Sequence, residues 1–394
     1  MIDKALLASV ITLLTLSLVM SYSLSVYTVV HFEYGDFHFF MRQGVAIVLG
    51  VMVMIALSKL DPDKWFVKIG LMLFLGFFLV MIVMQFLPES IVKAVGGAKR
   101  WIHFGSLSLA PVEFFKVGFV FFLAWSFSRK LLGKKEKISF FSELGMYMPY
   151  MFIFMIVVMI IAVFQKDLGQ VVVLGATLMV FFFLVGSSWK FFLMIFLGII
   201  GGIIGLIIAA PHRILRLKSW WGTVQDSILS LLPFDRLQQF RIEAIKEPYQ
   251  ISNSLNAIHN GGFWGTGLGN GQFKLGYLSE VHTDFILAGI IEELGFMGIF
   301  FVTGILFFIV YRVFMIAKHM NTPMYYFFSI GVGLLIAFAF ILNAYGISGM
   351  TPIKGIAVPF LSYGGSHILA SCLAIGLVLM ISKKIPRDID GKIL

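Results

Sequence analysis

The sequence predicts an all-α polytopic membrane protein with ten transmembrane helices. Of its 394 residues, 59% are hydrophobic and only 13% are charged. Soluble globular chains carry about 25% charged residues, so this chain has too little charge to cover a water-facing surface. The composition therefore excludes a soluble enzyme, a disordered chain and a secreted disulfide scaffold. The one cysteine, Cys372, lies inside an apolar run and cannot form an intrachain disulfide.

Ten apolar runs are long enough to cross a bilayer, which takes about 20 residues of α-helix. They lie at about residues 5–30, 43–59, 69–87, 109–127, 145–164, 168–187, 190–210, 285–312, 323–344 and 366–382. The first run is too long for a cleaved signal and has no small-residue cleavage site, so we expect it to be retained. We expect residues 1–394 to form a single integral membrane domain.

The distribution of Lys and Arg predicts the orientation. With the N-terminus inside, basic residues such as Lys59, Lys64 and Lys68 concentrate in the inside connections. Cytoplasmic connections favour Lys and Arg. We therefore expect an N-in/C-in protein with a large extracytoplasmic loop at about 211–282, between spans seven and eight. The net charge of +10 fits this anchoring. Nucleic acid is not an expected partner, because no basic stripe lies on a polar domain.

Ionisable residues near the outer ends of the spans are the candidate functional residues, because charge at membrane depth is costly. Glu113 and Lys116 share one helix face. They either neutralise each other so that the helix can insert, or line an outer cavity. Asp284 opens the eighth span, either as a helix-terminal carboxylate or as a functional group. Glu292 and Glu293 should point into the bundle or into a wet cavity rather than at lipid.

Several other outer features have two interpretations. Asp167 lies in a tight turn and either caps the next helix or is functional. The Gly-rich stretch 261–271 either approaches a ligand closely or forms a flexible turn. Ser366 is expected to cap the last span. Nine basic residues lie outside, either merely solvated or suited together to an anionic amphiphile such as a lipid-linked phosphate: Lys99, Arg100, Arg213, Arg216, Lys218, Arg236, Arg241, Lys246 and Lys274.

Short motifs follow one another in a recognisable order. They are Gly97-Ala98-Lys99-Arg100-Trp101-Ile102, Pro111 with Glu113 and Lys116, Gln165 with Asp167-Leu168-Gly169, Tyr249-Gln250, Lys274-Leu275-Gly276-Tyr277-Leu278, His282-Thr283-Asp284-Phe285-Ile286, and Lys354-Gly355 with Pro359 through Ser366. In this order they resemble the SEDS family (shape, elongation, division and sporulation). The sequence departs from the family pattern at Ala110, Val112, Lys166, Asn253, Ser279 and His367. The stretch Gly267-Leu268-Gly269-Asn270 is more similar to the division branch than to the elongation branch.

The resemblance implies a peptidoglycan glycosyltransferase. Such an enzyme polymerises lipid II, a disaccharide-peptide on undecaprenyl diphosphate, into β-1,4 glycan strands with inversion. It works at the outer face of the cytoplasmic (inner) membrane, here for septal wall synthesis in cell division. The implied partners are a class B penicillin-binding protein, an FtsI-like transpeptidase, and other division proteins. An elongation polymerase, a lipid II flippase and a scaffold are the alternatives.

The resemblance also assigns roles to residues. Asp284 corresponds to the family's proposed general base, and its pKa could be raised by burial or lowered by nearby helix amides. Candidate contacts to the diphosphate are the cations Lys99, Arg100, Lys116 and Lys274. Trp101 either stacks on sugar or belongs to an interfacial aromatic belt. The remaining substrate-binding candidates are Glu113 and His282. No cofactor is firmly expected, and a divalent cation, Mg²⁺ or Mn²⁺, is left open.

Overall fold

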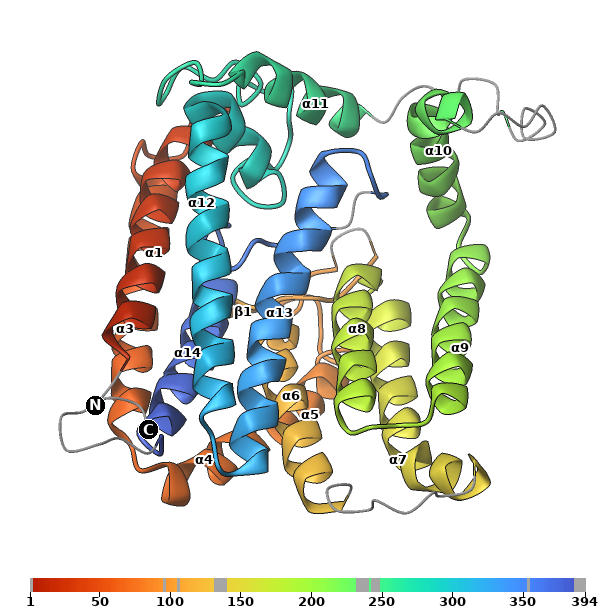
Figure 1. Ribbon diagram of the computed structural model, residues 1–394. Helices are drawn as coiled ribbons and strands as arrows, with labels where there is room; N and C mark the ends of the chain where they lie inside the picture. The colour runs from red at the N-terminus through yellow and green to blue at the C-terminus, as the bar shows by residue number, and fades with distance from the viewer. Residues whose placement is uncertain are drawn as a thin grey trace.

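The computed structural model describes residues 3–94, 97–104, 107–130, 140–231, 241, 249–352 and 355–385, which form a helical bundle (Figure 1). In chain order the elements are α1 (Lys4–Leu24), α2 (Val26–His31), α3 (His38–Lys59), α4 (Pro62–Leu71), the π-helix η1 (Met72–Gly76), α5 (Phe77–Val83), β1 (Ile102–Phe104), β2 (Leu107–Leu109), α6 (Pro111–Lys130), α7 (Phe140–Val158), the π-helix η2 (Met159–Phe164), α8 (Leu168–Leu184), α9 (Trp189–Ile208), α10 (Pro211–Leu231), α11 (Tyr249–Gly261), α12 (Ile286–Lys318), α13 (Pro323–Ile347) and α14 (Gly365–Ser382).

The predicted all-α membrane fold is confirmed. Among the described residues, nine helical segments are long and apolar enough to cross a membrane. The sixth predicted span is present as the shorter apolar helix α8, Leu168–Leu184. Its 17 residues extend about 25 Å, a little less than the hydrocarbon core. The count of ten crossings therefore stays a prediction.

Three local features differ from the expectation. The first span ends earlier, because Ser25 separates α1 from the short helix α2. The outer segment at 211–282 contains the helices α10 and α11 rather than loop alone. A two-stranded antiparallel hairpin, β1–β2, pairs Ile102 with Leu109 just before α6.

Local sequence explains where several helices begin. Proline is the first residue of α4, α6, α10 and α13, where its missing N–H is not needed. Aspartate caps other helices, because a carboxylate can accept from the free N–H groups of the first turn. Asp3 accepts from the Leu6 amide of α1, and Asp167 accepts from the Gln170 amide of α8. The capping interpretation of Asp167 is thus confirmed.

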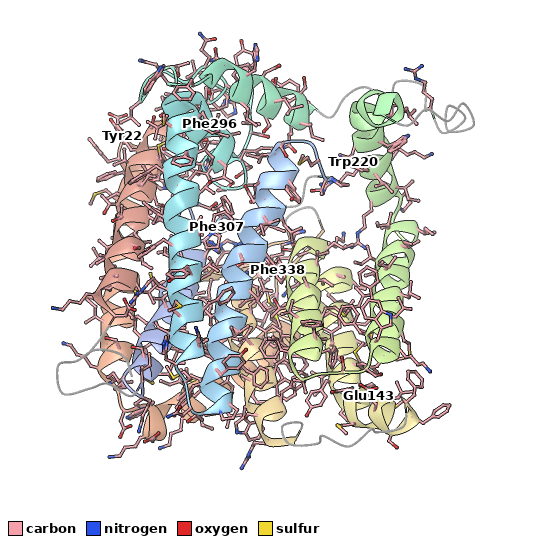
Figure 2. All side chains as sticks on the ribbon, in the orientation of Figure 1. Tyr22, Glu143, Trp220, Phe296, Phe307 and Phe338 are labelled. Atoms are coloured by element: carbon pink, nitrogen blue, oxygen red, sulfur yellow. The ribbon has the colours of Figure 1, made fainter. Side chains whose placement is uncertain are left out.

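The first and last described stretches of the chain, which begin at Asp3 and end at Ile385, lie at one end of the bundle, here named the terminal end (Figure 1). Asp3, before α1, pairs with Arg312 near the end of α12 at 2.5 Å. Lys384, after α14, pairs with Asp63 of α4. Two termini on one side are what an even number of crossings requires. Figure 2 shows Glu143 at this end and Phe296 and Trp220 at the other.

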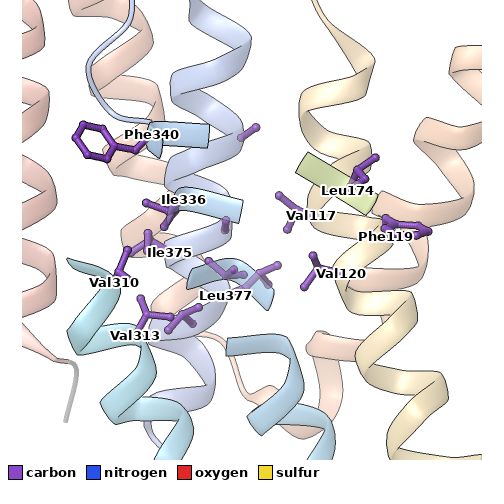
Figure 3. Packing of buried hydrophobic residues seen from close by; sticks show 14 of the residues in the cluster. Val117, Phe119, Val120, Leu174, Val310, Val313, Ile336, Phe340, Ile375 and Leu377 are labelled. Atoms are coloured by element: carbon purple, nitrogen blue, oxygen red, sulfur yellow. The ribbon is translucent and has the colours of Figure 1, made fainter. Parts of the chain in front are cut away.

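The middle of the bundle is packed with apolar side chains. Val117 of α6, Leu174 of α8, Val313 of α12, Ile336 of α13 and Ile375 of α14 belong to one buried cluster (Figure 3). Lipid offers no hydrophobic drive between helices, so close packing and dispersion hold such contacts.

A break in α12 anchors the Gly-rich segment at the end opposite the terminal end. Gly295 has φ of 68° and ψ of −167°, so the helical hydrogen bonds stop there. The loop replaces them. The Phe296 amide donates to the Gly262 carbonyl, and the Glu292 carbonyl accepts from the Thr266 amide. The Gly-rich segment is therefore explained by close backbone packing against α12.

Candidate functional site

Ionisable and polar side chains from five segments gather near the first turns of α6, α8 and α14. We name this group the polar cluster. Its members act on one another through hydrogen bonds, ion pairs or electrostatic interaction: Arg100, Glu113, Lys116, Asp167, Gln170, Asp284 and His367. The cluster lies at the end of the bundle opposite the terminal end, because α12 begins just after Asp284 and ends near Asp3.

Glu113 is the most heavily bonded member. One of its oxygens, Oε2, lies 2.9 Å from Lys116 Nζ and 2.9 Å from His367 Nδ1. The other, Oε1, accepts from Gln170 Nε2 at 3.2 Å. Gln170 also accepts from Lys116 Nζ at 2.8 Å. Every charge in this network is thus paired and hydrogen-bonded, as a buried charge requires.

Arg100 braces the turn that carries Asp167. Its Nε donates to the Gln165 carbonyl at 2.7 Å and its NH2 donates to the Lys166 carbonyl at 3.0 Å. Lys99 is also used locally, donating to the carbonyls of Gln85 and Leu87. Both cations stay partly exposed, so both can still meet an anion.

The Asp284 backbone is held by hydrogen bonds to its segment. The carbonyls of three consecutive residues, His282, Thr283 and Asp284, are each bonded by a different group. They accept from the Tyr363 amide at 2.9 Å, the Ser362 hydroxyl at 2.7 Å and Asn343 Nδ2 at 2.7 Å. The main chain under Asp284 therefore has little freedom.

The Asp284 carboxylate is not held in this way by the described residues. Within the described part of the chain it makes no hydrogen bond or ion pair. It lies against Gly355, where a β-carbon would come within 2.9 Å of Oδ2. Any other residue at that position would crowd the carboxylate.

The pKa of Asp284 is raised to about 7. Burial is the largest cause, and the negative charges of Glu280 and Asp167 add to it. Arg100 and His367 oppose the rise. Burial likewise raises the pKa of Asp167, against the Arg100 cation. The sequence left open whether the pKa of Asp284 is raised or lowered, and in the structure it is raised.

The other predicted residues near Asp284 are placed as follows. His282 is buried, with its ring 5.0 Å from that of Phe39 and 5.5 Å from that of Tyr363. Burial lowers the pKa of His282, so it is neutral near pH 7. Trp101 is partly exposed and directly precedes β1.

Lys274 lies in a second polar group, separate from the polar cluster. It forms an ion pair with Glu293 at 2.6 Å, with exposed side-chain fractions of 3% and 0%. Ser23 of α1 donates to the same carboxylate at 2.7 Å. Glu292 accepts from the Gln272 amide at 2.6 Å. Both glutamates thus point into the bundle as expected, and Lys274 is committed to holding α1, α12 and the Gly-rich loop together.

The remaining predicted residues either lie outside the described part of the chain or make contacts other than those expected. Arg236, Lys246 and Lys354 lie outside the described residues. The cap expected from Ser366 is wrong, because Gly364 precedes the first turn of α14 and makes no side-chain cap. The Ser366 hydroxyl instead donates to the Ser108 carbonyl and accepts from the Ala110 amide.

Sequence reasoning missed Asn343, Gln170 and Ser362 as supports of the site. Each is buried and polar. Asn343 bonds the Asp284 carbonyl and also the Ile356 carbonyl at 2.7 Å, joining two segments. The available signal was a lone amide within an apolar span, a residue type that bonds across helices.

The fold and site together define an integral membrane protein with several membrane-crossing helices and an ionisable site near one end of the bundle. A family model described as a cell cycle protein, FtsW/RodA/SpoVE, matches residues 4–386. The chain belongs to this family.

Two relatives illustrate the range of similarity. The chain is 48% identical over 385 residues to the "Probable peptidoglycan glycosyltransferase FtsW" of Helicobacter pylori, covering 97% of this chain and 98% of that protein. It is 33% identical to the protein of the same description from Idiomarina loihiensis, covering 96% and 86%.

Solved structures show the same fold. The rod shape determining protein RodA of Thermus thermophilus matches with a TM-score of 0.65, covering 98% of each chain. A chain from a peptidoglycan synthase complex matches with a TM-score of 0.71, covering 98% of this chain and 99% of that one. Both are 20% identical to this chain, and at that identity the likeness shows the fold alone.

We expect Lys274→Met to destabilise the protein by about 3 to 5 kcal/mol, because it leaves the buried Glu293 charge uncompensated. Thermal unfolding in detergent measures the change. Lys274→Met combined with Glu293→Leu should recover most of the loss.

The matched control for Lys274→Met is Lys384→Met, which removes the cation of the exposed pair with Asp63 and should change stability little. A Lys274→Met protein that melts with the wild type would contradict a structural role for the pair.

Proposed function

We propose that this chain is a peptidoglycan glycosyltransferase that polymerises lipid II for the septal wall. The observation that carries the proposal is the carboxylate of Asp284, which makes no hydrogen bond or ion pair with any residue that the structure describes and has a pKa of about 7. The family membership and the description shared by the relatives from two genera support it.

Glycosyl transfer needs a base beside the acceptor's 4-hydroxyl group and cations beside the departing diphosphate. Asp284 takes the proton. A base works best when its pKa lies near the operating pH, as the value here does. Arg100 and Lys99 are the partly exposed cations of the site, while Lys116 and Lys274 are buried in ion pairs. One displacement at the anomeric carbon inverts it and yields a β-linkage.

A divalent cation stays a prediction. No group of three or more His, Cys, Asp or Glu side chains in the described ranges could hold a metal ion. A Mg²⁺ or Mn²⁺ ion would therefore be bound chiefly by the diphosphate of the substrate, and no step is assigned to it.

The polymerase is favoured over the flippase by the distribution of polar groups. A flippase needs a polar path through the membrane. The described charges of the site gather at one end, and the middle of the bundle is filled by residues such as Val117, Val313 and Ile375 (Figure 3).

We further propose a class B penicillin-binding protein of the FtsI type as the partner, in the inner membrane, with the site facing the periplasm. The likeness in fold to a chain of a peptidoglycan synthase complex supports this. Division rather than elongation rests on the relatives described as FtsW.

The test is purified protein, with and without the transpeptidase, given labelled lipid II in detergent or vesicles. We expect a glycan ladder on a gel, and none from Asp284→Asn, because an amide cannot accept the proton. Asp63→Asn, an exposed carboxylate at the terminal end, is the control and should polymerise normally. A ladder from Asp284→Asn would refute the base, and translocation of lipid II without a ladder would indicate the flippase.

The pH dependence of polymerisation should follow Asp284. Its raised pKa means that it is mostly protonated below about pH 7, so kcat/KM should rise through that pH. Because the Arg100 cation lowers this pKa, Arg100→Gln should move the acid limb up by as much as about one unit. Arg312→Gln at the terminal end should leave the limb in place. If the acid limbs of the wild type and Arg100→Gln lie at the same pH, Asp284 is not the titrating group.

Asn343→Leu should lower kcat by about tenfold to a hundredfold, because the Asp284 carbonyl loses its donor and the base can shift. Steady-state kinetics on labelled lipid II, with thermal unfolding beside them, would measure this. Ser329→Ala is the control on the same helix, since the buried Ser329 hydroxyl has no hydrogen-bond partner in the described part of the chain. Unchanged kcat in Asn343→Leu would show that Asp284 needs no such support.

A further inference from the structure

Gln43 is a polar residue inside the apolar helix α3, and its side chain is 0% exposed. Burying an amide away from water is unfavourable unless its donors and its acceptor are hydrogen-bonded. Both polar atoms of this amide have partners, which lie in α1 and in residues 358–364, here named the loop before α14. An apolar side chain of the same length would fill this place, so what the amide contributes is its hydrogen bonds.

The bonds of Gln43 hold the loop before α14 against α3. Its Nε2 donates to the Ser362 carbonyl at 3.4 Å, and its Oε1 accepts from the Gly364 amide at 3.2 Å. Nε2 also donates at 2.8 Å to the hydroxyl of Ser17 in α1, and that hydroxyl donates to the Leu361 carbonyl at 2.6 Å. Gln43 and Ser17 together thus bond three backbone groups of the loop.

The loop before α14 needs such partners because it is buried without being a helix or a strand. Residues 358–362 are all buried. The backbone N–H and C=O groups of a buried segment must be hydrogen-bonded, and the regular pattern of a helix or sheet does not do this here. The loop makes bonds within itself, from the Leu361 and Ser362 amides to the Val358 carbonyl. The bonds from Gln43 add a fixed position relative to α3.

The same loop holds the main chain beneath the candidate base, Asp284. The Ser362 hydroxyl donates to the carbonyl of the residue before Asp284 at 2.7 Å, and the Tyr363 amide donates to the His282 carbonyl at 2.9 Å. Gln43 bonds the Ser362 carbonyl and the amide of the residue that follows Tyr363. A short series of hydrogen bonds therefore connects Gln43 with the main chain beneath Asp284.

We propose that Gln43 is a positioning residue for the glycosyl transfer, because it fixes the loop before α14 and, through that loop, the main chain that presents Asp284. Gln43 is buried, so it acts without touching the substrate. It complements Asn343, which bonds the Asp284 carbonyl from α13. The inference rests on the proposed function and adds to it a second support for the base, on α3.

The first test compares the wild type with Gln43→Met, which keeps the length of the side chain and removes its hydrogen bonds. We expect kcat on labelled lipid II, per mole of folded protein, to fall by about tenfold, because a small displacement of a base is costly. KM should stay within about twofold of the wild type, because no contact to substrate is lost. Ser58→Ala is the matched control on α3 and should leave kcat unchanged, since the buried Ser58 hydroxyl donates to the Ile55 carbonyl of its own helix.

Hydrogen exchange measured by mass spectrometry gives a second readout, which needs no turnover. The Thr283 and Phe285 amides both donate to the Glu280 carbonyl, so peptides that cover 283–285 report on the main chain of the candidate base. In Gln43→Met we expect these peptides to exchange about threefold faster or more, together with those of the loop before α14. A residue that only stabilised its own surroundings would change the loop and leave 283–285 unchanged.

Unchanged kcat in folded Gln43→Met, a loss found only in KM, or unchanged exchange at 283–285 would each overturn the proposal and leave the glycosyltransferase assignment intact. If Gln43→Met does not fold, Gln43→Asn, which keeps the amide but is shorter by a methylene group, replaces it in both measurements with the same expectations. A wild type that makes no glycan would refute the proposed function, and the exchange measurement would still test whether Gln43 holds the segment.

Discussion

The cost of carrying charge into a low-dielectric membrane is the constraint on which this structure depends. Each buried charge meets it by pairing. Glu113 joins α6 to α8 through Gln170 and to α14 through His367. Glu293 joins α12 to α1 and to the Gly-rich loop through Ser23 and Lys274. Because separating any pair would leave an unpaired charge, these two groups stabilise the packing of the half of the bundle opposite the terminal end.

The same constraint distinguishes the carboxylates that stabilise the fold from the carboxylate that is available for the reaction. A carboxylate that is fully paired, such as Glu113, is committed to its hydrogen bonds and ion pairs. Asp284 has a rigid main chain and a carboxylate without such partners in the described residues, so burial raises its pKa instead. The hydrogen bonds to the segment 282–284 are therefore made to its backbone carbonyls, and among the described residues the Asp284 side chain stays available.

The sequence could predict whatever depends on local pattern or on the cost of burial. Apolar run lengths located the membrane helices, and the cap at Asp167 followed from turn chemistry. The inward direction of Glu292 and Glu293 followed from the expense of exposing charge to lipid. Pairings across the fold could not be predicted this way, because nothing local in the chain indicates that Asn343 meets Asp284 or that His367 meets Glu113, which is 254 positions away.

Backbone strain also occurs in the segments around the site. Four described non-glycine residues have positive φ. Glu33, with φ of 54°, follows α2, and the other three are Lys166, Glu280 and Phe360, with φ of 52°, 58° and 64°. Such conformations are costly, and they persist only where surrounding bonds over-determine them. The last three lie in segments that carry or brace the site, where Arg100 donates to the Lys166 carbonyl and the Ser362 hydroxyl bonds the Val358 amide and the Thr283 carbonyl. Three of the four non-glycine residues with positive φ in the described part of the chain thus lie in the segments around the Asp284 carboxylate.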